Sequence, residues 1–104
     1  KVYDGSCALG PGIVLSDVEP LRDLPIQIVI ERNSQRVFEG ETRSSRIKRG
    51  LEELAGYLFR ELSFPAGAYL LTGTGIVPPA EFSMQRGDVV RIRIAELELE
   101  NPVS

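Results

Sequence analysis

Residues 26–32 form the clearest strand pattern of the chain, with the sequence Ile26-Gln27-Ile28-Val29-Ile30-Glu31-Arg32. Its isoleucines alternate with other side chains and fall on one face of a strand, since successive side chains point to opposite sides of a sheet. Residues 33–34 are Asn-Ser, a pair typical of tight turns, and residues 35–42 suit a second extended segment. A β-hairpin is therefore predicted at residues 26–42.

An amphipathic helix is predicted next, over residues 51–62. Its apolar positions recur at the spacing of one helical face: Leu51, Leu54, Ala55, Leu58, Phe59 and Leu62. Gly50 is an acceptable N-cap, and Pro65 and Gly67 are expected to end the helix. Because each buried leucine stabilises a fold by about 1.5–3 kcal/mol, we expect this helix to cover a sheet.

Three further strands are expected in the second half of the chain. Residues 69–72 are predicted to be a short buried strand that ends in a glycine-rich sequence. Residues 86–88 form a turn into an alternating strand over residues 89–95, and residues 97–102 continue as a final edge strand. The first 19 residues are expected to be loop with one short strand. The predicted fold class is mainly β with one covering α-helix, an α+β arrangement.

Composition excludes several classes of function. The 104 residues match the size of one domain, and the net charge of -3 argues against a nucleic-acid partner. The absence of histidine excludes Ser-His-Asp and Cys-His catalysis and histidine-ligated zinc. No apolar stretch approaches the roughly 20 residues that cross a bilayer, so no membrane contact is expected. A single cysteine, Cys7, excludes an internal disulfide and fits a cytoplasmic protein.

Charged residues gather in two places. Residues 43–49 contain four cations without interleaved aromatics, a pattern typical of a solvated segment that leads into a helix. Two alternatives for this segment are an anion contact at the rim of an active site and a contact with a protein partner. Glu96, Glu98 and Glu100 recur at a spacing of two, which predicts a solvated strand face rather than a metal site.

The most distinctive local sequence is the TGTG loop, Thr72-Gly73-Thr74-Gly75. Glycines on both sides of Thr74 permit close approach of a ligand, so backbone N–H groups and the Thr74 hydroxyl can converge on an anionic oxygen. From these residues alone, a structural turn and a ligand-binding loop are both open. Taken singly, Lys1 is interpreted as a solvated lysine and Cys7 as a packed small side chain.

Two motifs in order resemble the fumarylacetoacetate hydrolase superfamily. The first motif is Lys1 and Asp4 followed by Leu9-Gly10-Pro11, and the second is Leu70-Leu71 followed by the TGTG loop. Members of that superfamily place a catalytic lysine before an aspartate and a later Gly-Pro, with a distant strand that ends in Ser/Thr-Gly-Thr. The whole chain, residues 1–104, resembles the C-terminal part of that catalytic domain, a mixed β-sandwich or roll.

One branch of the superfamily is especially similar. Residues 71–79, with residues 87–90 and 100–103 after them, resemble the branch of 2-keto-3-deoxy sugar-acid dehydratases, such as those acting on 2-keto-3-deoxy-arabinonate. Residues 5–8, Gly-Ser-Cys-Ala, depart from the superfamily, which usually has an aromatic residue and a second proline there. This departure concerns the shape of the substrate pocket.

The resemblance implies an enzyme that acts on a 2-oxo acid through an enolate, with magnesium or another divalent ion as Lewis acid. Lys1 and Thr74 are the implied catalytic residues. Lys1 would supply electrostatic stabilisation or proton transfer, and Thr74 a hydrogen bond to the substrate carboxylate or keto oxygen. Thr72, Gly73 and Gly75 are implied to bind substrate. The superfamily's metal ligands, two glutamates and an aspartate, precede the lysine, so we expect them upstream and none within this chain.

Dehydration of a 2-keto-3-deoxy sugar acid is the expected reaction. Carbon–carbon hydrolysis of the acylpyruvate or fumarylacetoacetate type is an alternative, because the same site template serves both reactions. A third hypothesis, of another class, is a non-catalytic scaffold or oligomerisation fragment that lacks the metal site, and this chain by itself is expected to be inactive. The implied partners are the small-molecule substrate and further copies of the chain in a homo-oligomer.

Overall fold

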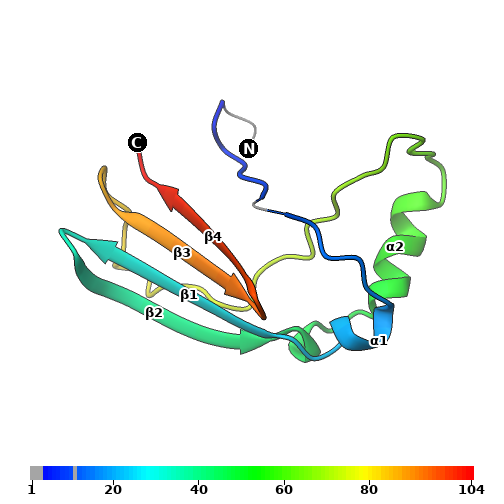
Figure 1. The fold of residues 1–104 in the computed structure, drawn as a ribbon, viewed down its shortest axis with the longest axis horizontal. Helices are drawn as coiled ribbons and strands as arrows, with labels where there is room; N and C mark the ends of the chain where they lie inside the picture. The colour runs from blue at the N-terminus through cyan, green and yellow to red at the C-terminus, as the bar shows by residue number, and fades with distance from the viewer. Residues whose placement is uncertain (1–3, 11) are drawn as a thin grey trace.

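The computed structural model describes residues 4–10 and 12–104, which contain a four-stranded antiparallel sheet. The sheet has the order β2-β1-β3-β4, and its strands are β1 (Pro25–Arg32), β2 (Gln35–Arg43), β3 (Val89–Ile94) and β4 (Leu97–Pro102). The helical elements are α1 (Val18–Leu21), the 3-10 helix η1 (Ser44–Arg46) and α2 (Leu51–Phe59). Figure 1 shows the sheet on one side of the molecule and α2 on the other. The predicted α+β class, mainly β, is confirmed. None of the described residues of α2 is buried, however, so this helix covers the sheet less closely than expected.

The β1–β2 hairpin has the predicted turn. Asn33 and Ser34 have φ angles of 51° and 62°, the left-handed values that a two-residue turn of type I′ requires. The alternation of β1 places Ile30 inside, where its side chain is wholly buried. The hairpin predicted from residues 26–42 is therefore confirmed, with β2 one residue longer than expected.

Strands β3 and β4 extend the sheet from β1. Ile30 pairs with Val90, and Ile28 pairs with Ile92, which itself pairs with Leu99 on β4. These cross-strand pairs place apolar side chains on one face, so this face carries the core. β4 lies at the edge of the sheet, as predicted for the last strand.

The remaining predicted strands are wrong. Residues 69–72 belong to no strand, and Tyr69 and Leu71 are 65% and 75% exposed. A short apolar run becomes a strand only where a neighbouring strand satisfies its backbone, and no strand of the described sheet pairs with it. The short strand expected before residue 20 is likewise absent from the described residues, and Leu15 is 94% exposed.

α2 begins at Leu51 as predicted but ends at Phe59, three residues before the expected end. The backbone N–H of Arg60 donates to the Tyr57 carbonyl at 3.4 Å, so the last turn tightens there. The ring of Phe59 meets that of Phe64 edge to face, with 5.5 Å between ring centroids. The chain therefore folds back just after the helix instead of extending it.

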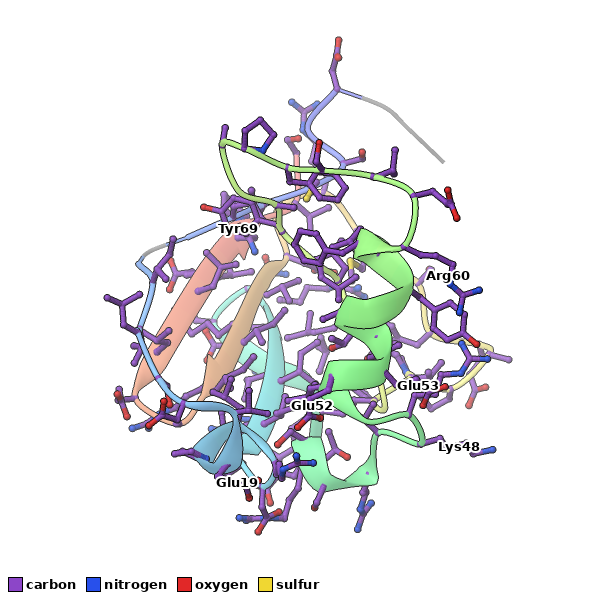
Figure 2. The ribbon with its side chains drawn as sticks, turned by 90° about the vertical axis from the view of Figure 1, so that its right-hand side faces the viewer. Glu19, Lys48, Glu52, Glu53, Arg60 and Tyr69 are labelled. Atoms are coloured by element: carbon purple, nitrogen blue, oxygen red, sulfur yellow. The ribbon has the colours of Figure 1, made fainter. Side chains whose placement is uncertain are left out.

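One arginine joins the two helices. Arg22, directly after α1, donates hydrogen bonds to Glu19 of α1 and to Glu52 in the first turn of α2. Figure 2 shows Glu52 on the face of α2 that lies toward α1, above Glu19. These exposed ion pairs connect the two helices but contribute little individual stability.

Candidate functional site

The TGTG loop and the basic segment, far apart in the sequence, share one cavity. This cavity has a volume of about 270 Å³, and all four residues of the loop line it. Its other walls come from β1, β2 and the segment after β2: Ile26, Thr42, Arg43, Arg46, Ile47 and Lys48. We refer to it as the loop cavity. This volume is slightly smaller than that of typical sites for drug-sized ligands, so the cavity suits only a small ligand.

Two close approaches bring the TGTG loop onto β2. A Cβ atom at Gly40 would lie 2.5 Å from Cγ2 of Ile76, so glycine at this strand position leaves the room that Ile76 occupies. A Cβ atom at Gly75 would lie 3.4 Å from Oγ1 of Thr42. In the view of Figure 1, the connection between α2 and β3 crosses behind β1 and β2. Glycine within a strand often marks such an approach of another backbone.

The loop itself is a preformed turn. The Thr74 hydroxyl accepts a hydrogen bond from the Ile76 N–H at 3.2 Å and donates one to the Ile76 carbonyl at 3.1 Å. Gly73 has a φ of 90°, which favours glycine. A hydroxyl has a single donor, so Thr74 can donate to a ligand only by turning away from the Ile76 carbonyl.

Hydrogen bonds through Ser44 anchor the basic wall of the cavity to the segment before β1. The Ser44 hydroxyl donates to the Leu21 carbonyl at 2.7 Å and accepts from the Leu24 N–H at 2.7 Å. The Ser44 N–H donates to the Leu24 carbonyl at 2.9 Å. The turn η1, which ends at Arg46, is therefore held at its first residue.

Asp23 neutralises one of the cations of the wall. Arg43 Nε and Nη2 donate to the two carboxylate oxygens of Asp23 at 2.7 and 3.0 Å, and the Ser45 hydroxyl donates to the same carboxylate at 2.7 Å. The hydrogen bond from Arg43 and then the one from Ser45 lower the pKa of Asp23 to about 2. Arg43 is therefore committed to Asp23 and contributes little net charge to the cavity.

The other two cations of the wall have no such partner. Among the residues that the structure describes, neither Arg46 nor Lys48 takes part in an ion pair. Both are exposed, and Figure 2 shows Lys48 extending outward from the segment that leads into α2. The solvated, helix-leading segment predicted from residues 43–49 is confirmed. Part of this segment also lines the loop cavity. The sequence predicted this only through the alternative of an anion contact at the rim of an active site.

The predicted site residues have mixed outcomes. Thr72, Gly73, Thr74 and Gly75 are brought together at the loop cavity, whereas Lys1 lies outside the described residues. Cys7 is exposed, so its interpretation as a packed side chain is wrong. The acidic alternation is confirmed as a solvated face, since Glu96 in the turn before β4 and Glu98 and Glu100 of β4 are all exposed.

Asp88 is a buried anchor that sequence reasoning missed. It lies in the turn before β3, is wholly buried, and binds Arg32 of β1. Its carboxylate also accepts a hydrogen bond from the Gln85 N–H at 2.8 Å. The bonds from Arg32 and then from Gln85 lower the pKa of Asp88 to about 2. This anchor fixes the end of the connection whose beginning carries the TGTG loop.

Within the part of the chain that the structure describes, no group of three or more Cys, Asp and Glu side chains could hold a metal ion. These residues therefore do not fit a divalent ion by themselves. Across the same residues, every helix is too short or too polar to span a bilayer.

Comparison with known proteins decides the family. The family model described as fumarylacetoacetate (FAA) hydrolase C-terminal matches residues 1–104. The chain belongs to the fumarylacetoacetate hydrolase family. A curated member, the probable 2-keto-3-deoxyxylonate dehydratase of Haloferax volcanii, is 39% identical over 95 residues, which are 90% of this chain and 33% of that protein. The 2-dehydro-3-deoxy-D-arabinonate dehydratase of Saccharolobus solfataricus is 38% identical over 98 residues, 93% of this chain and 33% of that protein.

Solved structures of the family have the same fold. A hexagonal crystal form of 2-keto-3-deoxyarabinonate dehydratase matches with a TM-score of 0.92 and 37% identity, covering 99% of this chain and 36% of that one. The 2-keto-3-deoxy-D-arabinonate dehydratase complexed with magnesium and 2,5-dioxopentanoate matches with a TM-score of 0.91 and 38% identity, covering 98% of this chain and 37% of that one. The resemblance to the dehydratase branch is confirmed, and the chain spans about a third of the length of these relatives.

Proposed function

We propose that the full-length gene product is a metal-dependent dehydratase of a 2-keto-3-deoxy sugar acid. Two curated relatives that are named as dehydratases of such acids match 90% and 93% of the chain, at 39% and 38% identity. The observation that carries the proposal is the loop cavity, where a glycine-rich turn faces uncompensated cations. Such a site suits an anionic substrate on which negative charge develops during reaction.

The reaction places a defined demand on the protein. Transfer of a proton from C3 of the substrate to a base leaves an enolate. Its electrons expel the C4 hydroxyl, which takes up one proton and leaves as water, and tautomerisation of the resulting enol yields an oxo-aldehyde. The negative charge on the enolate oxygen must be stabilised by donors that are already in place. The TGTG loop lines the cavity, so its backbone N–H groups are candidate donors, and the Thr74 hydroxyl becomes one when it turns from the Ile76 carbonyl toward the substrate.

Lys1 has a complementary role in this proposal. A lysine ammonium near the enolate oxygen would stabilise its charge or transfer a proton. The support is the family motif, in which Lys1, Asp4 and the later Gly10-Pro11 occur in order. The position of Lys1 relative to the loop cavity remains a prediction.

Magnesium accompanies one of the related enzymes, in the complex with 2,5-dioxopentanoate. The described residues do not offer a set of ligands for it, so no reaction step is assigned to an ion bound by them. As the family motif implies, we expect two glutamates and an aspartate upstream of Lys1 to bind the ion. Residues 1–104 would then be the C-terminal part of the catalytic domain, and a homo-oligomer in the cytoplasm remains a prediction.

Product analysis tests the proposal. The full-length gene product would be incubated with magnesium and a 2-keto-3-deoxy pentonate, and the mixture followed by NMR. Formation of 2,5-dioxopentanoate is the expected result. Release of pyruvate from an acylpyruvate would instead support the carbon–carbon hydrolase, and inertness toward both substrates in a protein without the upstream carboxylates would support the scaffold.

A further inference from the structure

The loop cavity is lined by more cations than are paired with acidic side chains. Arg43, Arg46 and Lys48 line it, and none of its lining residues within the described part of the chain is acidic. Asp23, which does not line the cavity, accepts hydrogen bonds from Arg43 and neutralises its charge. The charges of Arg46 and Lys48 therefore remain available to an anion that enters the cavity.

We propose that Arg46 binds the carboxylate of the 2-oxo acid substrate and that Lys48, at the outer rim, attracts the anion toward it. This inference rests on the proposed function, because it assigns a group of this chain to the charged end of that substrate. An arginine guanidinium presents a planar set of donors that matches a carboxylate, whereas a lysine ammonium acts as a mobile point charge. The two residues therefore have different roles.

The anchoring of η1 makes Arg46 suitable for binding. Ser44 is held by three hydrogen bonds to Leu21 and Leu24, and Ser45 is held by Asp23. The backbone beside Arg46 is therefore ordered before a ligand arrives, which lowers the entropic cost of binding. Lys48 follows η1 in the sequence and is exposed.

The opposite interpretation is that Arg46 and Lys48 are solvated cations without a ligand. Arg49 provides a matched control, because it is an exposed cation of the same segment that does not line the loop cavity. If the interpretation as solvated cations is right, replacement of Arg46 and of Arg49 will have equal effects. If the proposal is right, only the cavity-lining cations will affect the binding of a carboxylate.

Titration calorimetry with pyruvate, the smallest 2-oxo acid, tests the proposal on the full-length gene product in magnesium-containing buffer. Pyruvamide, which lacks the carboxylate charge, is the comparison ligand. Arg46→Ala is expected to weaken pyruvate binding about tenfold, the effect of losing a charge-assisted hydrogen bond, and to leave pyruvamide binding unchanged. Lys48→Ala is expected to weaken pyruvate binding about threefold at low salt, an effect that disappears at high salt.

The outcomes separate the two proposals. Pyruvate binding that Arg46→Ala weakens no more than Arg49→Ala overturns the assignment of Arg46 and leaves the proposed function standing. Equal weakening of pyruvate and pyruvamide by Arg46→Ala also overturns it, because the effect would not depend on the carboxylate. A lack of pyruvate binding by the unsubstituted protein contradicts the proposed function together with this inference.

Discussion

Arg32 and Asp88 form a two-point ion pair between the end of β1 and the beginning of β3. Arg32 Nε donates to Asp88 Oδ1 at 2.8 Å, and Arg32 Nη2 donates to Asp88 Oδ2 at 2.9 Å. Arg32 Nη2 also donates to the Ser83 carbonyl at 3.1 Å, and the ring of Phe82 lies 6.0 Å from the guanidinium carbon. The pair therefore ties the connection that carries the TGTG loop to the sheet.

Asp88→Asn is expected to lower the thermal stability of the full-length gene product. The substitution keeps the shape of the side chain but removes the charge that Arg32 binds inside the fold. Asp23→Asn is the matched control, since it weakens a comparable pair with Arg43 whose two side chains are about half exposed. Thermal denaturation followed by circular dichroism should show the larger loss for Asp88→Asn. Equal losses would mean that burial adds nothing to the Arg32–Asp88 pair.

Acid is expected to remove the contribution of Asp88. Its pKa lies near 2 in the folded protein, below the ordinary value of 3.8, so the folded state binds this proton less tightly than the unfolded state. The stabilisation is therefore complete above pH 3.8 and is lost as the pH falls toward 2. Urea denaturation of the unsubstituted and Asp88→Asn proteins should give a constant difference near neutral pH that shrinks in acid. A difference that grows in acid would contradict the sign of this shift.

Gly40→Ala is expected to displace the TGTG loop through Ile76. The added Cβ would lie 2.5 Å from Ile76 Cγ2, so the loop must move away from β2 or the strand must yield. We expect kcat/KM for the sugar acid to fall about tenfold, since small displacements of positioning groups are costly to catalysis. The double variant Gly40→Ala/Ile76→Ala, in which the clashing methyl is gone, should recover part of the loss. Full activity in Gly40→Ala would show that this contact does not position the loop.

Thr74→Ala and Lys1→Ala are each expected to reduce kcat tenfold or more. Loss of one donor to a developing oxyanion typically costs about 10² to 10³ in rate. Thr74→Ser, which keeps the hydroxyl, should retain most of the activity and thereby separates the donor from the methyl group. Steady-state kinetics of the full-length gene product would measure all three variants. Unchanged turnover in Thr74→Ala or Lys1→Ala would remove that residue from the site.

Much of the sheet was predictable because its signals are local. The alternation of residues 26–32 and the turn at Asn33-Ser34 determine the hairpin with little help from the rest of the chain. The strand expected at residues 69–72 failed for the opposite reason. Its apolar run has no pairing strand among the described residues, and pairing is a long-range property that composition does not carry.

The site was predictable in part. The TGTG loop was recognisable because its glycines and hydroxyls are adjacent in the sequence. Arg46 and Lys48 line the same cavity as that loop, and this contact between distant parts of the chain has no local sequence pattern. Asp88 was interpreted only as part of a turn, because its burial depends on Arg32, 56 positions earlier in the chain.

A crystal structure of the full-length gene product with magnesium and a 2-oxo acid tests the site most directly. The ligand is expected in the loop cavity, with its carboxylate within hydrogen-bonding distance of Arg46 and with Thr74 or a backbone N–H of the TGTG loop donating to one of its oxygens. The ammonium of Lys1 is expected on the side of the keto oxygen. A ligand bound elsewhere, with the loop cavity free of it, would contradict the assignment of this cavity as the substrate site.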